Sequence, residues 1–349
     1  MLSFSLKNGV IIMLKSMYLE NFKCYGPKGA QFDLAPLTFL YGDNSAGKST
    51  FLQAISLLSD TLDAKPANPF EIDPARRLTD LTDDAFNALV FKRTDTAAIK
   101  IQVETLSNDK LCKIERQISK IGNAVALEEK IEGTNKSDLR SFLPMVEHCV
   151  APRPETALAT GSSLAQLTRD SVKETMVKYA GEKVNAMLVK LGYHYEYIDT
   201  NLFRDLIFEM PVAAKNVGAS VHAIANILNK ITALMNGGIL MLEEPETHLH
   251  PKYIGPFAEI IVDAIRNKEK SSSQIVVECH SDLMILAVQG LIRLNRLSQD
   301  MVKIIYMTKG AEGTSVSDIP FDENGNFIQE WPDKDGFYPE RLDLISRGW

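Results

Sequence analysis

The sequence predicts an α/β protein with a mainly parallel central sheet, an antiparallel β subdomain and a helical insertion. Three observations lead to this prediction. Short apolar strands alternate with amphipathic helical segments between residues 217 and 307, which is typical of a parallel sheet with helices on both faces. Residues 98–105 and 111–121 alternate in hydrophobicity, as antiparallel strands do. Residues 137–192 instead have the periodicity of helices.

Composition places the chain among globular proteins and excludes several other classes. Hydrophobic residues make up 45% of the 349 residues and charged residues 24%. No apolar run approaches the roughly 20 residues that span a bilayer, so we expect no membrane partner. The net charge of −7 argues against a protein that coats nucleic acid unaided. The four cysteines are far apart and form no CxxC pair, which favours reduced thiols and a cytoplasmic location.

The predicted elements follow one another in a clear order. A hairpin and then a buried strand are expected over residues 16–41, followed by a helix over 49–58. Residues 65–95 are rich in Pro and Asp, which predicts a loop. The second half is expected to contain helices at 171–191, 217–235, 251–266 and from 282, strands at 238–242, 274–278 and 302–307, and a tight turn at Asn324-Gly325.

These elements divide the chain into five segments. The apolar start lacks the cleavage site of a signal peptide, so we interpret it as a disordered or mis-called extension before Met13. The segments are the extension at 1–12, an N-terminal lobe at 13–136, a helical insertion at 137–200, a C-terminal lobe at 201–320 and a tail at 321–349.

A glycine-rich loop between the first buried strand and its helix fits the pattern G-x-x-x-x-G-K-[ST]. Glycines allow the backbone to wrap closely around phosphates, and the helix N-terminus favours an anion. Lys48 would reach the β- and γ-phosphates of ATP, and the Ser49 hydroxyl would bind Mg²⁺. The residues expected to bind the nucleotide are Gly42, Asp43, Asn44, Ser45, Ala46, Gly47, Lys48, Ser49 and Thr50.

A second motif is the apolar strand 238–242, which ends in acidic residues. In a parallel sheet this strand end would lie at the same edge as the glycine loop. We therefore expect Glu243 to hold the Mg²⁺ shell and Glu244 to be the catalytic carboxylate that polarises the attacking water.

Residues 242–251, Leu-Glu-Glu-Pro-Glu-Thr-His-Leu-His-Pro, resemble the segment after the acidic strand in ABC-type AAA family ATPases of the RecF, SMC and OLD-nuclease group. Residues 17–25 resemble the first strand of the same group, and Cys279-His280-Ser281 resembles its switch histidine. The tail from Asp322 resembles a bacterial stand-alone subfamily with a C-terminal domain of unknown function. The resemblance implies that His280 contacts the γ-phosphate as part of the catalytic group.

These ATPases also carry a signature motif that acts in trans on the nucleotide of a second subunit. Asn216-Val217-Gly218-Ala219-Ser220 is the best match, and it implies roles for Gly218 and Ser220. It lacks the paired glycines of a transporter signature, and a simple helix cap by Ser220 is the alternative interpretation.

The leading hypothesis is an ATP-hydrolysing head that forms a head-to-tail homodimer around ATP and Mg²⁺ and acts as a clamp or switch. Because no second catalytic domain follows, we expect an effector or nuclease in trans, in DNA-related work or anti-phage defence. DNA binding is a further hypothesis. The alternatives are a nucleotide-switched binding module with negligible turnover and the ATPase subunit of a transporter. Absence of the expected glutamine after the first helix argues against the transporter.

Overall fold

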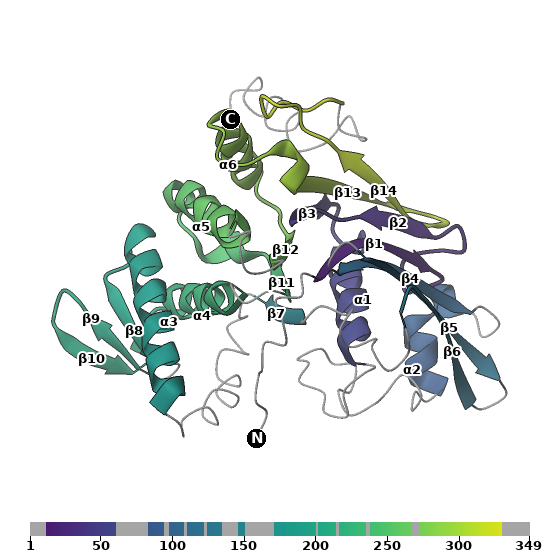
Figure 1. Cartoon of the computed structure of the whole chain (residues 1–349), viewed down its shortest axis with the longest axis horizontal. Helices are drawn as coiled ribbons and strands as arrows, with labels where there is room; N and C mark the ends of the chain where they lie inside the picture. Colours follow the sequence, from purple (N-terminus) through teal and green to yellow (C-terminus); the bar gives the residue numbers. More distant parts are fainter. Residues whose placement is uncertain are drawn as a thin grey trace.

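Three sheets and six α-helices make up the part of the chain that the structure describes (Figure 1). The computed structural model describes residues 12–60, 83–93, 98–107, 110–121, 124–134, 146–150, 171–199, 202–213, 216–234, 238–266 and 273–329. The predicted fold class is confirmed: a mainly parallel central sheet lies beside an antiparallel sheet, and helices cover both.

The central sheet has the strand order β14-β13-β3-β12-β11-β7, and only β14 runs antiparallel to its neighbour. The strands β3, β12 and β11 are buried over almost their whole length, because both faces of the sheet are covered there. Their bounds are β3 (Leu37–Gly42), β7 (Val146–Val150), β11 (Gly238–Glu243), β12 (Ser273–Glu278), β13 (Val302–Gly310) and β14 (Gly313–Ile319).

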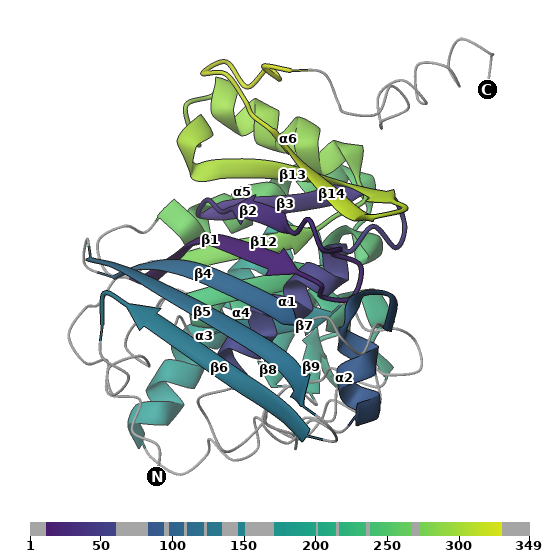
Figure 2. The same cartoon turned by 90° about the vertical axis from the view of Figure 1, so that its right-hand side faces the viewer.

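The second sheet is antiparallel, with the order β2-β1-β4-β5-β6, and it lies across the central sheet in Figure 2. Its strands are β1 (Ile12–Glu20), β2 (Ala30–Asp33), β4 (Ile99–Ser107), β5 (Lys110–Ile121) and β6 (Ala124–Glu132). A small third sheet has the order β10-β9-β8 and consists of β8 (Tyr195–Asp199), β9 (Leu202–Asp205) and β10 (Met210–Ala213).

Helices cover the central sheet from both sides (Figure 1). α1 (Lys48–Asp60) lies between the central and antiparallel sheets, whereas α4 (Ala219–Leu234), α5 (Ile254–Arg266) and α6 (Asp282–Arg293) lie on the opposite face. α3 (Ser171–Lys190) packs on α4, and α2 (Asp83–Leu89) packs near β6. Short 3-10 helices complete the described elements: η2 (Phe91–Arg93), η5 (Pro245–His248), η6 (Pro251–Tyr253) and η7 (Gln299–Met301).

Two hydrophobic cores share the central sheet, one on each face. Along β11, Ile239 and Met241 face the core around α1, whereas Leu240 and Leu242 face the core around α4, α5 and α6. This alternation follows from the period of two in a strand. Burial on both faces fixes the register of the strand, because a shift by one residue would exchange the two faces.

Two expectations from the sequence need correction. The segment 137–200 is not purely helical, since β7 pairs in parallel with β11 and β8 forms part of the third sheet. The expected loop at 65–95 contains α2, because Phe86 and Leu89 are buried in the core around α1. Propensity alone did not reveal these elements, which depend on contacts with distant segments.

Other expectations from the sequence fall partly outside the described residues. The expected extension at 1–12 lies outside them except for Ile12, which begins β1, and the tail beyond residue 329 lies outside them entirely. The predicted turn at Asn324-Gly325 is confirmed, since Asp322 and Asn326 close it with a backbone hydrogen bond. Among the described side chains, Cys24, Cys112 and Cys279 are free thiols.

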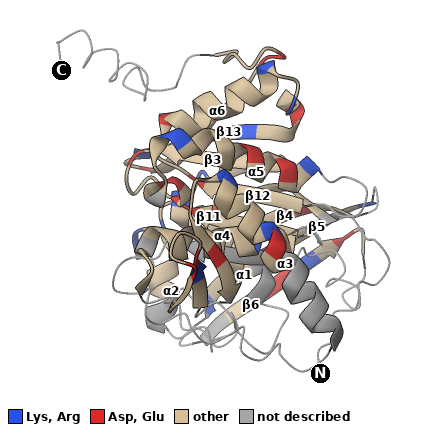
Figure 3. Ribbon diagram, turned by 90° about the vertical axis from the view of Figure 1, so that its left-hand side faces the viewer, with Lys and Arg blue, Asp and Glu red and all other residues tan. Residues whose placement is uncertain are grey.

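The outer surface of the helical layer carries interspersed charges of both signs (Figure 3). Glu259 of α5 accepts from Lys190 at 2.7 Å and from Arg296 at 2.9 Å, which ties α5 to α3 and to the segment after α6. No helix among the described residues is both long enough and apolar enough to cross a membrane.

A buried glutamine joins the two large sheets. The register of β1 against β4 shifts between Leu14 and Ser16, and β2 pairs only from Ser16 onward. The backbone of Leu14 is bonded instead by Gln274 of β12: Leu14 N donates to its Oε1 at 2.6 Å, and its Nε2 donates to Leu14 O at 2.9 Å. Gln274 therefore satisfies two buried backbone groups at once.

We predict that Gln274→Leu, which keeps the side-chain size, leaves both Leu14 groups buried without partners. Each such group costs roughly 1–3 kcal/mol, so the free energy of unfolding should fall by about 2 kcal/mol or more. Unfolding by denaturant measures this change in the free energy of unfolding. Gln31→Leu, on the exposed strand β2, is the matched control and should change stability by no more than about 0.5 kcal/mol. Equal stability of both variants would contradict the role of Gln274.

Candidate functional site

The glycine loop connects β3 to α1 as the sequence predicts, and two of its glycines are required by the structure. Gly42 has φ 134° and Gly47 has φ 108°, a region that residues with a side chain rarely adopt. A Cβ on Gly42 would lie 2.0 Å from the backbone oxygen of Met307, and one on Gly47 would lie 2.4 Å from the Sγ of Cys24. The loop therefore depends on glycine at both positions.

Lys48 is the first residue of α1, and its ammonium lies over the loop. The Nζ donates to the backbone oxygens of Gly42 at 2.9 Å and Asp43 at 2.8 Å. Burial lowers the pKa of Lys48, while the nearby carboxylates of Glu278, Asp43 and Glu244 oppose that shift. The ammonium is thus positioned where it can neutralise a phosphate held by the loop.

Ser49 contacts a carboxylate that the sequence analysis did not single out. Its hydroxyl donates to Glu278, with distances of 2.8 Å to Oε2 and 3.1 Å to Oε1. Glu278 is the last residue of β12 and is 5% exposed. The pKa of Glu278 is raised to about 7, chiefly by burial and also by the charges of Glu243 and Glu244, while the Ser49 hydrogen bond and Lys48 oppose the shift.

Glu243 and Glu244 lie at the end of β11, next to Glu278 on β12. Glu243 pairs with Glu278 in the parallel register. Glu244 has a left-handed backbone (φ 44°, ψ 49°), and its N–H donates to the backbone oxygen of Glu278 at 2.9 Å. A left-handed residue with a side chain costs on the order of 1 kcal/mol or more, and such strain is concentrated at functional sites.

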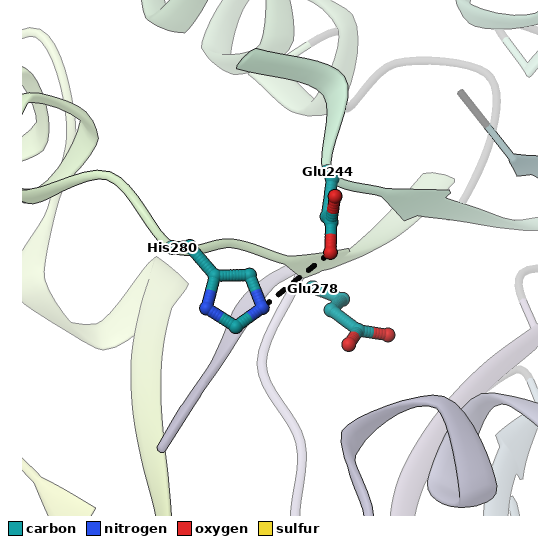
Figure 4. A group of neighbouring side chains, drawn as sticks. All are labelled: Glu244, Glu278 and His280. Atoms are coloured by element: carbon teal, nitrogen blue, oxygen red, sulfur yellow. Dashed lines mark ion pairs between the residues drawn. The ribbon is translucent and has the colours of Figure 1, made fainter. Parts of the chain in front are cut away.

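His280 completes the group from the segment after β12 (Figure 4). Its Nε2 lies 3.6 Å from Oε1 of Glu244, and its backbone N–H donates to Oε1 of Glu246 at 2.7 Å. Burial lowers the pKa of His280, and the Lys48 ammonium lowers it further, while Glu244 and Glu246 oppose both. One ligand atom each of Glu244, Glu278 and His280 lies within 4.8 Å of the other two.

The structure thus brings most of the predicted residues together. Lys48, Ser49, Glu244 and His280 lie at the carboxyl edge of the central sheet, as expected for parallel strands. Thr50 follows in the first turn of α1, and the remaining residues from Asp43 to Ala46 form the loop itself. The hydroxyl and carboxylate oxygens of this group are ligands of the kind that Mg²⁺ prefers, so the residues present fit that cation.

The signature-like segment is not part of this group. Gly218 lies before the first residue of α4, and Ser220 hydrogen-bonds with Tyr193, on the side of the third sheet. A Cβ added to Gly218 would meet only the Oγ of Ser220, at 3.9 Å, within 4 Å. The space in front of the segment is therefore open within the described chain.

Sequence reasoning missed Glu278. An apolar strand that ends in an acidic residue singled out Glu243, and the same pattern occurs at Gln274–Glu278 before His280. Applied to both strands, that pattern would have identified both carboxylates. It would not have shown which of them contacts Ser49.

Comparisons with known proteins agree with this geometry. A sequence model described as an AAA domain matches residues 16–171. A second model, described as "AAA domain, putative AbiEii toxin, Type IV TA system", matches residues 231–286. The first covers the glycine loop, and the second covers the acidic strand end and His280. The chain is therefore similar to AAA domains over the two segments that supply the candidate site.

Solved structures of SMC heads are similar to this chain in fold. An SMC head bound to the C-terminal winged-helix domain of ScpA matches with a TM-score of 0.61 and 12% identity, over 88% of this chain and 98% of that one. The Pyrococcus furiosus Smc head, bound to the C-terminal domain of ScpA, matches with a TM-score of 0.58 and 11% identity, over 89% and 97%.

The SMC head from Thermotoga maritima matches this protein with a TM-score of 0.51 and 13% identity, over 88% and 99%. At these identities the likeness establishes the fold of an SMC head. A search of curated proteins finds no match to this chain.

We predict that Glu278→Gln stabilises the protein at high pH. A carboxyl whose pKa rises on folding contributes stability below its unfolded pKa of about 4.5 and loses it as pH rises through about 7. The amide does not ionise, so the melting temperature of the variant should exceed that of the unchanged protein at about pH 8 and match it near pH 4. Calorimetry in EDTA at the two pH values measures the melting temperatures.

The matched control for this experiment is Glu128→Gln on β6, where the glutamate is exposed. It should show no such pH-dependent gain. An equal gain for Glu278→Gln at both pH values would contradict the assignment.

Proposed function

We propose that this protein binds and hydrolyses ATP with Mg²⁺ and uses the nucleotide as a switch for a head-to-tail dimer. The observation that carries the proposal is the convergence of Lys48 and Ser49 with Glu244 and His280 at one edge of the sheet. The hydrolysis step replaces the bond from the γ-phosphorus to the β–γ bridging oxygen with one from a water oxygen, and it yields ADP and phosphate.

The chain's own groups would perform distinct tasks. The loop N–H groups and Lys48 would hold the phosphates and neutralise their charge. Glu244 would orient the water and accept its proton, and its strained backbone, fixed by the Glu278 carbonyl, restricts where that carboxylate can lie. Ser49 and Glu243 would hold Mg²⁺, which supplies charge stabilisation to the transferred phosphoryl group when bound. His280 would donate to the γ-phosphate.

We predict that Glu244→Gln lowers ATP turnover by about 100-fold or more, because the amide cannot accept a proton. Nucleotide affinity should change little, since Lys48 and the loop remain. Phosphate release and binding of a fluorescent ATP analogue measure the two effects. Glu128→Gln on β6, the same change at an exposed glutamate away from the site, is the matched control. Unchanged turnover in Glu244→Gln would favour the alternative of a binding module with negligible turnover.

The dimer is proposed because the signature-like segment lies apart from the chain's own glycine loop. In an ABC-type head, Gly218 and Ser220 would complete the site of a second subunit in trans. The exposure of Gly218, where an added Cβ would meet only the Ser220 Oγ within 4 Å, supports this arrangement.

We predict that Glu244→Gln with ATP forms a dimer and that adding Gly218→Glu abolishes it, because the new carboxylate would repel the partner's phosphates. Light scattering after size-exclusion chromatography measures the mass. Gly255→Glu on α5 is the matched control, since a Cβ there also meets nothing within 4 Å. A monomer in the Glu244→Gln background, or a dimer that tolerates Gly218→Glu, would contradict the head-to-tail arrangement.

A partner effector completes the proposal. The family whose model matches residues 231–286 is described as a putative AbiEii toxin of a Type IV TA system, which favours a role in defence. Two similar SMC heads are bound to a domain of ScpA, which favours a head that works with a second protein. We therefore propose that the dimer switches a separate effector, in a defence or DNA-related process.

A further inference from the structure

The strand order brings Glu278 closer to the glycine loop than Glu243. β12 lies between β3 and β11, and Glu278 pairs with Leu40 on one side and Glu243 on the other. Neighbouring strands are about 4.8 Å apart. Glu278 is therefore one strand away from the loop-bearing strand, whereas Glu243 is two strands away.

The contact between Ser49 and Glu278 orients the serine hydroxyl. A hydroxyl has one hydrogen to donate and two lone pairs to offer. The distances of 2.8 Å and 3.1 Å direct the Ser49 hydrogen toward the Glu278 carboxylate. The lone pairs of the Ser49 oxygen then point away from Glu278 and are available to a cation. The hydrogen bond to a carboxylate also makes the serine oxygen a better electron-pair donor.

Glu278 also contacts the backbone of the proposed catalytic carboxylate. Its carbonyl oxygen accepts from Glu244 N at 2.9 Å, while its side chain accepts from Ser49. One residue thus fixes both the serine hydroxyl and the left-handed backbone of Glu244. In Figure 4 its carboxylate lies beside Glu244 and His280. The mutual repulsion of these carboxylates would fall when a divalent cation binds among them.

We propose that Glu278 is the positioning residue that orients the Ser49 hydroxyl to ligate the Mg²⁺ of MgATP. The neighbouring strand β12 then supplies the serine's carboxylate partner, and Glu243 on β11 adds a second carboxylate to the shell. This inference rests on the proposed function, because it requires that the protein binds MgATP.

The test compares nucleotide affinity in Mg²⁺ and in EDTA, with a fluorescent non-hydrolysable ATP analogue and the full chain. The ratio of the two affinities measures the contribution of the cation. Glu278→Ala should reduce that ratio by about 10- to 100-fold, as loss of a partner that orients a metal ligand does. Affinity in EDTA should stay unchanged, which also shows that the variant is folded. Glu128→Ala on β6 is the matched control.

Two further variants distinguish positioning from a charge effect. Glu278→Gln keeps an oxygen that accepts from Ser49. It should therefore reduce the ratio of the affinities in Mg²⁺ and in EDTA less than Glu278→Ala does. Adding Glu278→Ala to Ser49→Ala should cause little further loss, because the glutamate acts through the serine. Losses that multiply, or an equal loss in the glutamine and alanine variants, would overturn the positioning role.

Paramagnetic resonance of Mn²⁺ bound with the analogue gives a second readout, in which Glu278→Ala should weaken Mn²⁺ binding to the complex. If the unchanged protein binds no analogue in either buffer, the proposed function fails and this inference with it. If the unchanged protein binds with a clear Mg²⁺ dependence that Glu278→Ala leaves intact, only the inference fails.

Discussion

The parallel pairing of β3, β12 and β11 is the constraint on which the candidate site depends. It brings the glycine loop, Glu278 and Glu243 to the same edge of the sheet, although Ser49 after the loop and Glu278 are 229 residues apart in sequence. Burial on both faces fixes the register, because a shift by one residue would exchange the two cores and turn the acidic side chains away from Ser49. The site is therefore a consequence of how the core packs.

That same packing brings three carboxylates close together at the edge of the sheet. Burial raises the pKa of Glu278, and the neighbouring charges of Glu243 and Glu244 act in the same direction. Lys48 and the hydroxyl of Ser49 offset this only in part. A protein that maintains a buried carboxylate close to two others beside a phosphate-binding loop is suited to a ligand that brings both cation and anion, and a nucleotide with Mg²⁺ is such a ligand.

Local patterns and long-range contacts explain what the sequence could and could not reveal. The glycine loop, α1 and β11 were predictable because their residues are contiguous and their periodicity is clear. The contact of Ser49 with Glu278 was not, because it depends on strand order across 229 residues. β7 and α2 were missed for a related reason: short elements with weak propensity form only where β11, or the core around α1, gives them a partner.

The contacts also suggest how the site could influence the signature-like segment in the other lobe. Glu278 binds the backbone of Glu244, which immediately precedes η5, and Glu246 within η5 accepts from the backbone of His280. η5 packs against α4, the helix that Gly218 precedes. A change in the contacts of Glu244 or His280 would therefore act on a short, strained segment that touches α4. Coupling through packed elements requires such continuity, and here it runs from the phosphate loop to the helix proposed to meet a second subunit.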